Sequence, residues 1–230
     1  MSVKAIIFDL DGTLLNTLED LADAVNRVLR ERGLPTHSLD AYRYFVGNGS
    51  EMLVKRALPD SRHDDEVVVR SCLDAFLRDY GQNWMVKTKP YDGVPAMLDA
   101  LIERGLKLAV LSNKRDEITK KSVKELLSKW TFDAVIGQRD EVPAKPDPAA
   151  ALEIARELQI APEEFIYLGD SAVDMKTAVA AGMFPVGALW GFRTSEELLA
   201  GGAAALIGRP VDLLQVLELR SGEERLRNKR

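Results

Sequence analysis

Lys4-Ala5-Ile6-Ile7-Phe8-Asp9-Leu10-Asp11-Gly12-Thr13, near the start of the 230-residue chain, is the stretch that decides the fold. Its first half is a short apolar run that predicts a buried strand. Asp9 and Asp11 follow one residue apart, so alternation along an extended chain aims both carboxylates at one small volume. Two like charges there are costly unless a cation or a shared proton relieves them. The pattern predicts a magnesium-assisted nucleophile beside an acid/base, although a strand end followed by an ordinary Asp-Gly turn also fits this stretch alone.

The composition limits the class of protein. The sequence is 46% hydrophobic with a net charge of −5, which suits a globular chain with a sizeable core and offers no basic stripe for nucleic acid. No apolar run approaches the roughly 20 residues that span a bilayer, and Asp9 comes too early for a signal peptide. Cys72 is the only cysteine, which leaves no disulfide framework. We expect a cytoplasmic monomer or homodimer without nucleic-acid or membrane partners.

Apolar runs that predict strands alternate with helical stretches over most of the chain. The predicted strands are 3–8, 106–111, 134–136, 165–168, 185–188 and 204–207. Helical stretches at 94–104, 116–129, 148–158, 175–181 and 195–199 separate most of them. This alternation predicts an α/β fold with a parallel sheet covered on both faces. Ligands of such sheets bind beyond the carboxyl ends of the strands, and Asp9, Ser112 and Asp170 follow three of those ends.

The interval between the first two of these strands breaks the alternation. Thr17, with Asp20 three residues on, predicts the start of a helix, and Gly33 predicts its end. Helical segments near 50–57 and 64–80 follow, without a convincing strand. We therefore predict an α-helical cap inserted into the core. The predicted core, cap and charged, disordered tail are residues 1–15 with 86–220, 16–85 and 221–230.

Three later segments place polar groups at successive strand ends. Ser112 and Asn113 offer a hydroxyl and an amide that can bond phosphoryl oxygens, although such a pair is common in loops. Lys145 comes just before a predicted helix and is a point cation suited to a phosphoryl group or a nucleophilic carboxylate. Taken alone, a lysine at such a position is more often a solvated surface residue. Asp170 and Asp174 are either magnesium ligands or helix-start residues favoured by the helix dipole.

Taken together, these segments resemble the four motifs of the haloacid dehalogenase superfamily. The matching residues are Asp9-Leu10-Asp11-Gly12-Thr13, Ser112-Asn113, Lys145-Pro146 and Gly169-Asp170-Ser171 with Asp174. The resemblance covers essentially the whole chain before the tail. It implies a Rossmann-like parallel-sheet core with a helical cap inserted after the first strand.

The resemblance also implies a role for each acidic residue. Asp9 would be the nucleophile that forms an aspartyl-phosphate. Asp11 would protonate the leaving alcohol and then deprotonate the attacking water. Mg²⁺ would be the cofactor, held by Asp9, the Asp11 carbonyl and Asp170, with Asp174 as a further ligand or a support for the others.

The same resemblance implies which residues bind the phosphoryl group. Ser112, Asn113 and Lys145 would contact its oxygens, and Thr13 would support the loop beside the substrate. A cis Lys145–Pro146 peptide bond is also expected from the family.

The presence of Asp11 limits which reactions of the superfamily the resemblance implies. The dehalogenases and the phosphonate-cleaving branch of the superfamily lack this second aspartate, whereas phosphate-ester hydrolases and phosphohexomutases keep it. The cap stretch from Phe45 to Leu58 resembles that of phosphoglycolate phosphatases, as do two core stretches beginning at Tyr91 and Ala188. Asp92 and Arg115 depart from that group, in which proline is usual at both positions.

The cap stretch contains the candidate substrate contacts outside the core. Gly47, Asn48 and Gly49 form a segment whose backbone amides can approach an anion closely; a plain turn before a helix is the alternative. Lys55 or Arg56 could meet a substrate carboxylate.

We therefore predict a magnesium-dependent phosphatase that hydrolyses a small phosphorylated metabolite, with 2-phosphoglycolate as the first candidate. A phosphohexomutase and a pyrophosphatase share the same motifs and remain alternatives. A phosphate-binding protein on a retired phosphatase fold is a further one. We expect the cap to move about hinges at 14–16 and 84–89 as it admits the substrate.

Overall fold

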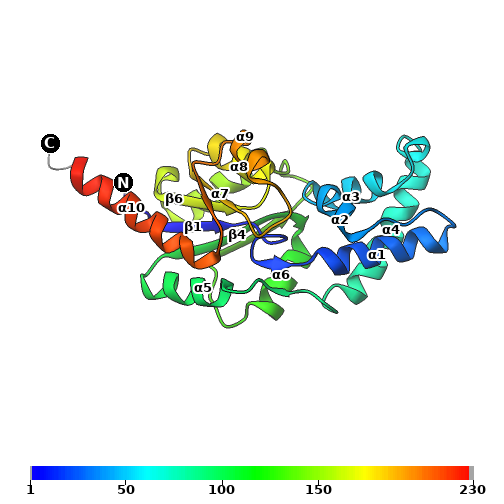
Figure 1. The fold of residues 1–230 in the computed structure, drawn as a ribbon, viewed down its shortest axis with the longest axis horizontal. Coiled ribbons are helices and arrows are strands. Elements are labelled where there is room, and N and C mark those ends of the chain that lie inside the picture. The colour runs from blue at the N-terminus through cyan, green and yellow to red at the C-terminus, as the bar shows by residue number, and fades with distance from the viewer. Residues whose placement is uncertain (1, 228–230) are drawn as a thin grey trace.

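The computed structural model describes residues 2–227, which form a sheet-centred core with a block of helices at one end (Figure 1). Six parallel strands make the core sheet in the order β5-β4-β1-β6-β7-β8. The strands are β1 (Ala5–Phe8), β4 (Lys107–Arg115), β5 (Ala134–Gln138), β6 (Phe165–Gly169), β7 (Phe184–Ala188) and β8 (Ala205–Ile207). All six predicted strands are present, and the α/β fold class is confirmed. β1 lies in the middle, with Phe8 opposite Val110 on one side and Leu168 on the other.

Alternation along β1 divides the core into two apolar layers. Ile6 and Phe8 belong to the layer beneath α5, α6 and α10, while Ala5 and Ile7 belong to the layer beneath α7 and α8. These helices are α5 (Val94–Glu103), α6 (Asp116–Leu126), α7 (Ala149–Leu158), α8 (Ala172–Ala180) and α10 (Leu213–Arg227), with α9 (Ser195–Ala200) beside α8. All four β1 side chains are fully buried. Burial on both faces explains why the first strand is an unbroken apolar run.

β4 is longer than the sequence predicted, because it continues past Leu111 to Arg115. Its register with β5 shifts between these two residues, and Arg115 then pairs with Gln138. The polar residues Ser112 and Asn113 therefore lie within a strand rather than in the loop after it. Their composition hid this continuation, since the apolar pattern stops at Leu111.

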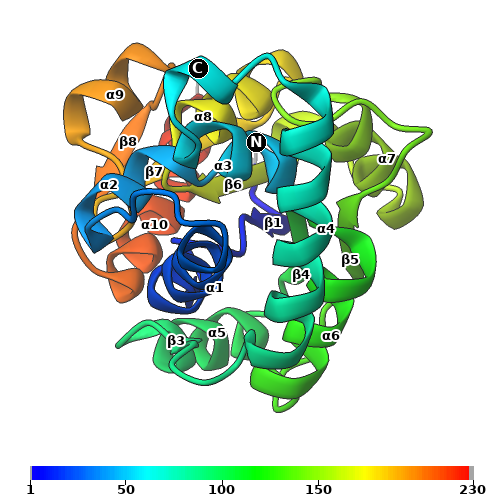
Figure 2. The same ribbon diagram turned by 90° about the vertical axis from the view of Figure 1, so that its right-hand side faces the viewer.

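The insert after β1 is an all-helical cap with an apolar core of its own (Figure 2). Its helices are α1 (Leu18–Glu31), α2 (Leu39–Phe45), α3 (Gly49–Ala57), a short 3₁₀ turn (Asp60–Arg62) and α4 (Glu66–Asn83). Cys72 is buried in that core, together with Phe76 and Tyr80. The cap packs over the end of the sheet at which β1, β4 and β6 terminate.

Two very short antiparallel strands, β2 (Leu15–Asn16) and β3 (Lys89–Pro90), join the cap to the core. They lie within and beside the predicted hinge segments.

The predicted start of a helix at Thr17 is confirmed, because α1 begins at the next residue, Leu18. The Thr17 side chain itself makes no capping hydrogen bond. Asp20 instead accepts hydrogen bonds from the backbone N–H groups of Lys87 (2.9 Å) and Thr88 (2.8 Å) and from the Thr88 hydroxyl (2.7 Å). Asp20 therefore fastens the first turn of α1 to the chain that returns from the cap.

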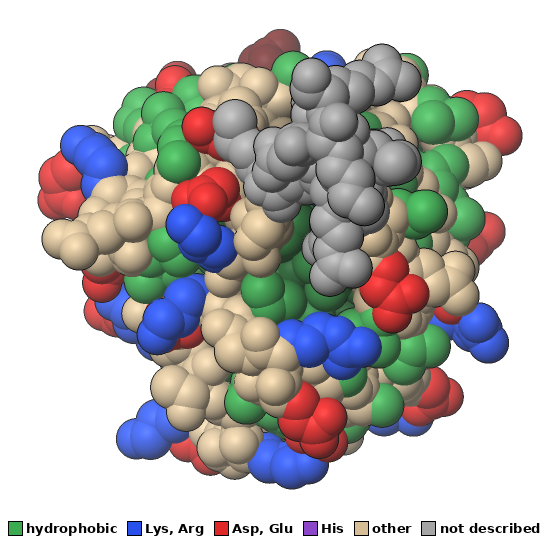
Figure 3. Space-filling view, turned by 90° about the vertical axis from the view of Figure 1, so that its left-hand side faces the viewer, with side chains coloured by type: hydrophobic (Ala, Val, Ile, Leu, Met, Phe, Trp, Pro, Cys, Tyr) green, Lys and Arg blue, Asp and Glu red, His purple; other side chains and the backbone are tan. Residues whose placement is uncertain are grey.

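The charged C-terminal stretch does not follow the prediction of disorder from residue 221, because α10 continues to Arg227. Residues 228–230 lie outside the described part of the chain. Acidic and basic side chains intermingle on the face of the core seen in Figure 3, without a region of one sign. Among the described residues, no helix is both long and apolar enough to cross a membrane.

Candidate active site

Four acidic or basic side chains meet beyond the carboxyl end of the core sheet. Asp9 follows β1 and Asp170 follows β6, while Asp174 lies in the first turn of α8 and Lys145 precedes α7. Carboxylate oxygens of Asp9, Asp170 and Asp174 all lie within 4.8 Å of one another. The Lys145 ammonium donates to Asp9 (2.9 Å), to Asp174 (2.6 Å) and to the Leu111 carbonyl (3.0 Å). Lys145 thus contacts one carboxylate 29 positions away and another 136 positions away in the chain.

This acidic cluster is buried and carries an excess of negative charge. Asp9, Asp170, Asp174 and Lys145 are each less than a tenth exposed. Burial raises the pKa of Asp9 well above its usual range, although Lys145 opposes the shift. Burial, reinforced by Asp174, raises the pKa of Asp170 to about 7. Three carboxylates facing one ammonium fit a divalent cation, because hard oxygen ligands and unbalanced negative charge are what such an ion requires.

Asp170 is oriented by neutral groups only. Its carboxylate accepts from the Thr13 hydroxyl (3.0 Å) and from the Phe192 backbone N–H (2.8 Å). Gly12 has φ +92°, and a Cβ there would lie 2.3 Å from the Asp170 Oδ2 atom. Only glycine therefore allows the loop after Asp11 to pass so close to the cluster. The predicted role of Thr13 as a support of this loop agrees with its contact to Asp170.

Asp174 is a helix-start residue, one of the two roles that the sequence left open, and its carboxylate also lies in the acidic cluster. One carboxylate oxygen accepts from the Ser171 hydroxyl (2.6 Å) and the Ser171 N–H (3.1 Å), which forms a capping box at the start of α8. Its other oxygen accepts from Lys145. A helix-capping residue is therefore also a member of the acidic cluster.

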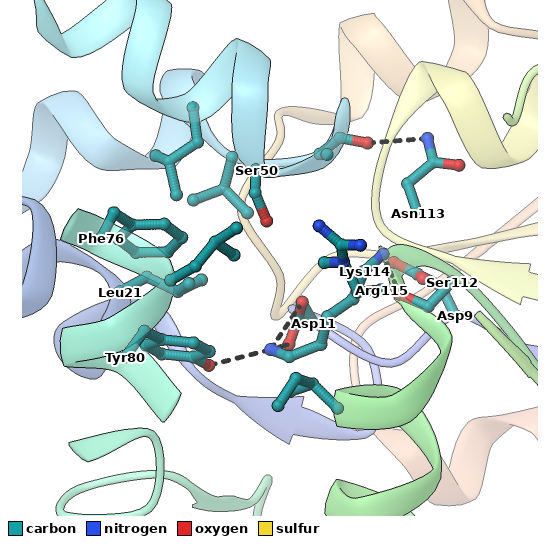
Figure 4. A pocket seen from close by; sticks show the side chains of 16 residues that line it. Asp9, Asp11, Leu21, Ser50, Phe76, Tyr80, Ser112, Asn113, Lys114 and Arg115 are labelled. Atoms are coloured by element: carbon teal, nitrogen blue, oxygen red, sulfur yellow. Dashed lines mark hydrogen bonds and ion pairs between the residues drawn. The ribbon is translucent and has the colours of Figure 1, made fainter. Parts of the chain in front are cut away.

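The Asp11 carboxylate points away from that cluster and pairs with Lys114. The Lys114 ammonium donates to both Asp11 oxygens (2.9 and 3.1 Å) and to the hydroxyl of Tyr80 on α4 (2.8 Å), as Figure 4 shows. We did not identify Lys114 from the sequence. A signal was present, because Lys114 stands two residues after Ser112 and alternation along a strand puts both on one side.

The amide of Asn113 is fully engaged with backbone groups. It donates to the Gly47 carbonyl (3.1 Å) and the Lys145 carbonyl (3.1 Å) and accepts from the Lys145 N–H (2.9 Å). It therefore links the cap segment to the loop that carries Lys145. Ser112, buried beside it, accepts from the backbone N–H of Lys114 (3.3 Å). The peptide bond between Lys145 and Pro146 is cis, as expected.

A pocket lies between the end of the sheet and the cap (Figure 4). It holds about 600 Å³ of empty space, part of it open to solvent. Core residues form one side and cap residues the other. The lining residues are Asp9, Asp11, Ser112, Asn113, Lys114, Arg115 and Ile118 from the core, with Leu21, Val46, Gly47, Gly49, Ser50, Leu53, Phe76, Leu77 and Tyr80 from the cap.

The predicted cap contacts are only partly at this pocket. Gly47 and Gly49 line it, whereas the Asn48 side chain accepts from Arg56 (2.9 Å). Arg56 also donates to the carbonyls of Tyr44 and Phe45, so it braces the loop before α3. Lys55 lines a separate surface hollow.

Arg115 is a second cation at the pocket, after Lys114, that the sequence did not lead us to expect. Its guanidinium points into the pocket (Figure 4), and within the described residues it has no hydrogen-bond or ion-pair partner. In the sequence, Arg115 stood out only because phosphoglycolate phosphatases usually have proline at this position.

Comparison with known proteins agrees with the geometry. The chain matches the haloacid dehalogenase-like hydrolase family over residues 6–188, a range that contains the whole acidic cluster. The chain therefore belongs to the haloacid dehalogenase-like hydrolases, as its motifs predicted.

Individual relatives define the group more closely. The phosphoglycolate phosphatase of Aquifex aeolicus is 32% identical over 216 residues, which cover 94% of this chain and 97% of that protein. The phosphoglycolate phosphatase of Nitrosospira multiformis is 34% identical over 203 residues, covering 86% and 88%. The crystal structure of a predicted phosphoglycolate phosphatase from Haemophilus somnus has a TM-score of 0.86 at 27% identity, covering 94% of this chain and 98% of that one. These similarities confirm the prediction of an enzyme, a phosphoric monoester hydrolase similar to the phosphoglycolate phosphatases.

Proposed function

We propose that the protein is a magnesium-dependent phosphatase that hydrolyses 2-phosphoglycolate through an aspartyl-phosphate at Asp9. The observation that carries this proposal is the pairing of Asp9 with Lys145 inside a buried cluster of three carboxylates. Bound Mg²⁺, held by Asp9, Asp170 and the Asp11 carbonyl with support from Asp174, would neutralise charge on the phosphoryl oxygens.

The chain's own residues supply the remaining steps. The Asp9 carboxylate attacks phosphorus while the bond from phosphorus to the leaving oxygen breaks, and Asp11 gives that oxygen its proton. Asp11 then takes a proton from water as the water attacks phospho-Asp9, which releases phosphate and restores the carboxylate. Lys145 offsets the charge of the phosphoryl group, because phosphoryl transfer depends mainly on positioning and charge neutralisation.

The substrate assignment has two supports. The relatives described above are named phosphoglycolate phosphatases. The pocket that Asp9 lines also contains the guanidinium of Arg115, whereas the other lining cation, Lys114, is paired with Asp11. A substrate with a carboxylate next to its phosphate ester would use both Asp9 and Arg115.

Phosphate release from a panel of esters, with Mg²⁺ and with chelator, tests the proposal. We expect magnesium-dependent turnover with 2-phosphoglycolate as the preferred substrate. A profile led by sugar phosphates or pyrophosphate would contradict the substrate. Isomerisation of a sugar phosphate would favour a mutase, and tight phosphate binding without turnover would favour a binding protein.

Asp9→Asn tests the mechanism, since an amide cannot act as the nucleophile. We expect turnover to fall at least about a thousand-fold, with the melting temperature retained. Transient labelling of the wild type, and not of the variant, by radiolabelled substrate identifies the phosphoenzyme. Appreciable turnover by the variant would overturn the proposed nucleophile.

A further inference from the structure

Lys114 joins three parts of the molecule that are far apart in the chain. It lies on β4 and contacts Asp11 in the loop after β1, 103 residues away, and Tyr80 in the cap, 34 residues away. Its side chain is 7% exposed. A buried ammonium needs partners for all of its donors, and here both Asp11 oxygens and the Tyr80 hydroxyl supply them.

The position of Tyr80 is set by the cap and not by the core. Its ring stacks on Phe76 with centroids 5.4 Å apart and planes at 16°, and both rings are buried in the cap's apolar layer. The Lys114 ammonium also lies 4.9 Å from the centre of the Tyr80 ring. Movement of α4 away from β4 would therefore remove one of the three groups that hold Lys114 in place.

Other features of the site leave the Asp11 carboxylate dependent on Lys114. Lys145 is occupied by Asp9 and Asp174, and the Thr13 hydroxyl by Asp170. Among the described residues, Lys114 is the side chain that forms an ion pair with Asp11.

From this geometry we infer that Lys114 and Tyr80 are positioning residues for Asp11, and that the cap aligns the acid/base by placing the Tyr80 hydroxyl against Lys114. This inference rests on the proposed function, in which Asp11 protonates the leaving oxygen. It adds that the Tyr80 hydroxyl of the cap, which contacts Asp11 only through Lys114, controls this proton donor. Closure of the cap would therefore complete the catalytic arrangement as well as cover the substrate.

The chemistry of the leaving group provides a test. Glycolate is a poor leaving group and needs a proton, whereas the acetate of acetyl phosphate departs without one. kcat/KM reports the steps up to phosphoryl transfer and excludes the later attack of water. A misplaced Asp11 should therefore lower kcat/KM for phosphoglycolate and spare kcat/KM for acetyl phosphate.

We would measure both substrates with Lys114→Met, Tyr80→Phe and the double variant, each in the full chain with Mg²⁺. For phosphoglycolate we expect kcat/KM to fall about 10- to 100-fold in Lys114→Met and about 3- to 10-fold in Tyr80→Phe. The double variant should lose no more than Lys114→Met, because the two residues act through one contact. For acetyl phosphate the change should stay within about 3-fold.

Matched controls are Lys107→Met, on the same strand, and Tyr42→Phe, whose hydroxyl binds Asn26 within the cap. Neither should alter the ratio of the two kcat/KM values. Tyr80→Phe keeps the stacked ring, so it stays informative if Lys114→Met fails to fold.

The possible outcomes separate the two proposals. Equal losses on both substrates, or additive losses in the double variant, would overturn the positioning inference while the wild-type activity still upheld the proposed function. A wild type that released phosphate from neither compound would overturn the proposed function and this inference with it.

Discussion

Asp9, Asp170 and Asp174 share one buried corner of the core with a single ammonium group, that of Lys145. Two of the carboxylates also make contacts that serve the fold, the helix cap at Asp174 and the loop contact at Asp170. The negative charge that the proposed chemistry needs therefore lowers the stability of the folded protein when no metal is bound. Removing charge from the cluster should stabilise the protein without metal and also inactivate it.

The pH dependence of stability should reveal this opposition. The pKa of Asp170 rises from its ordinary 3.8 to about 7 on folding, so between these values the folded protein binds more protons than the unfolded one. The contribution of Asp170 to the free energy of unfolding is therefore favourable below about pH 4, and it is lost as the pH rises through about 7. In chelator, the wild type should lose melting temperature relative to Asp170→Asn between pH 5 and pH 8. Mg²⁺ should stabilise the wild type most at the higher pH. An equal difference between the two proteins at both pH values would contradict the prediction.

Arg115 offers a prediction about substrate recognition. Arg115→Gln removes from the pocket a guanidinium that has no partner among residues 2–227, so KM for 2-phosphoglycolate should rise about 10-fold, with kcat little changed. Ethyl phosphate, which has no carboxylate, should show no such rise. Lys107→Gln is the control, since Lys107 lies at the start of the same strand, pairs with Asp133 and does not line the pocket. A similar rise for both esters would mean that Arg115 does not recognise the carboxylate.

Among the elements, the start of α1 and the chain entering β3 depend most on each other. Asp20 is 2% exposed and accepts hydrogen bonds from two backbone N–H groups and one hydroxyl of the returning linker. Buried donors that lose such a partner cannot turn to water. The pairing of β2 with β3 is only two residues long on each side, so it adds little on its own.

Asp20→Ala should therefore lower the free energy of unfolding by about 2–4 kcal/mol. Asp23→Ala is the matched control on the same helix, because Asp23 pairs with Lys87 while 43% exposed and should cost less than about 1 kcal/mol. Urea denaturation followed by circular dichroism measures both values. A loss no larger than that of the control would show that Asp20 does not secure this junction.

At the scale of the whole molecule, local sequence patterns predicted the architecture well. They did not predict contacts between residues that are far apart in the chain. Apolar periodicity and strand–helix alternation predicted all six core strands and three of the inserted helices, because burial leaves a direct trace in the sequence. The short helix α2 (Leu39–Phe45) was not predicted. The continuation of β4 to Arg115 depends on pairing with a distant strand, so its polar residues resembled a loop. The contact between Lys114 and Tyr80, and the direction of Arg115, depend on how the cap meets the core, which no local pattern encodes. The charged end of α10 shows that composition alone does not exclude a helix.

The two-stranded ribbon of β2 and β3 affects how the sequence of this protein can evolve. Leu15 pairs with Pro90 and Asn16 with Lys89, so the chain leaves the sheet and returns to it at the same place. The entropy of closing a loop grows only slowly with its length. The stretch between these residues can therefore be lengthened, shortened or rebuilt while the sheet keeps every strand. Evolution can therefore alter the cap side of the pocket and retain the core that carries the acidic cluster.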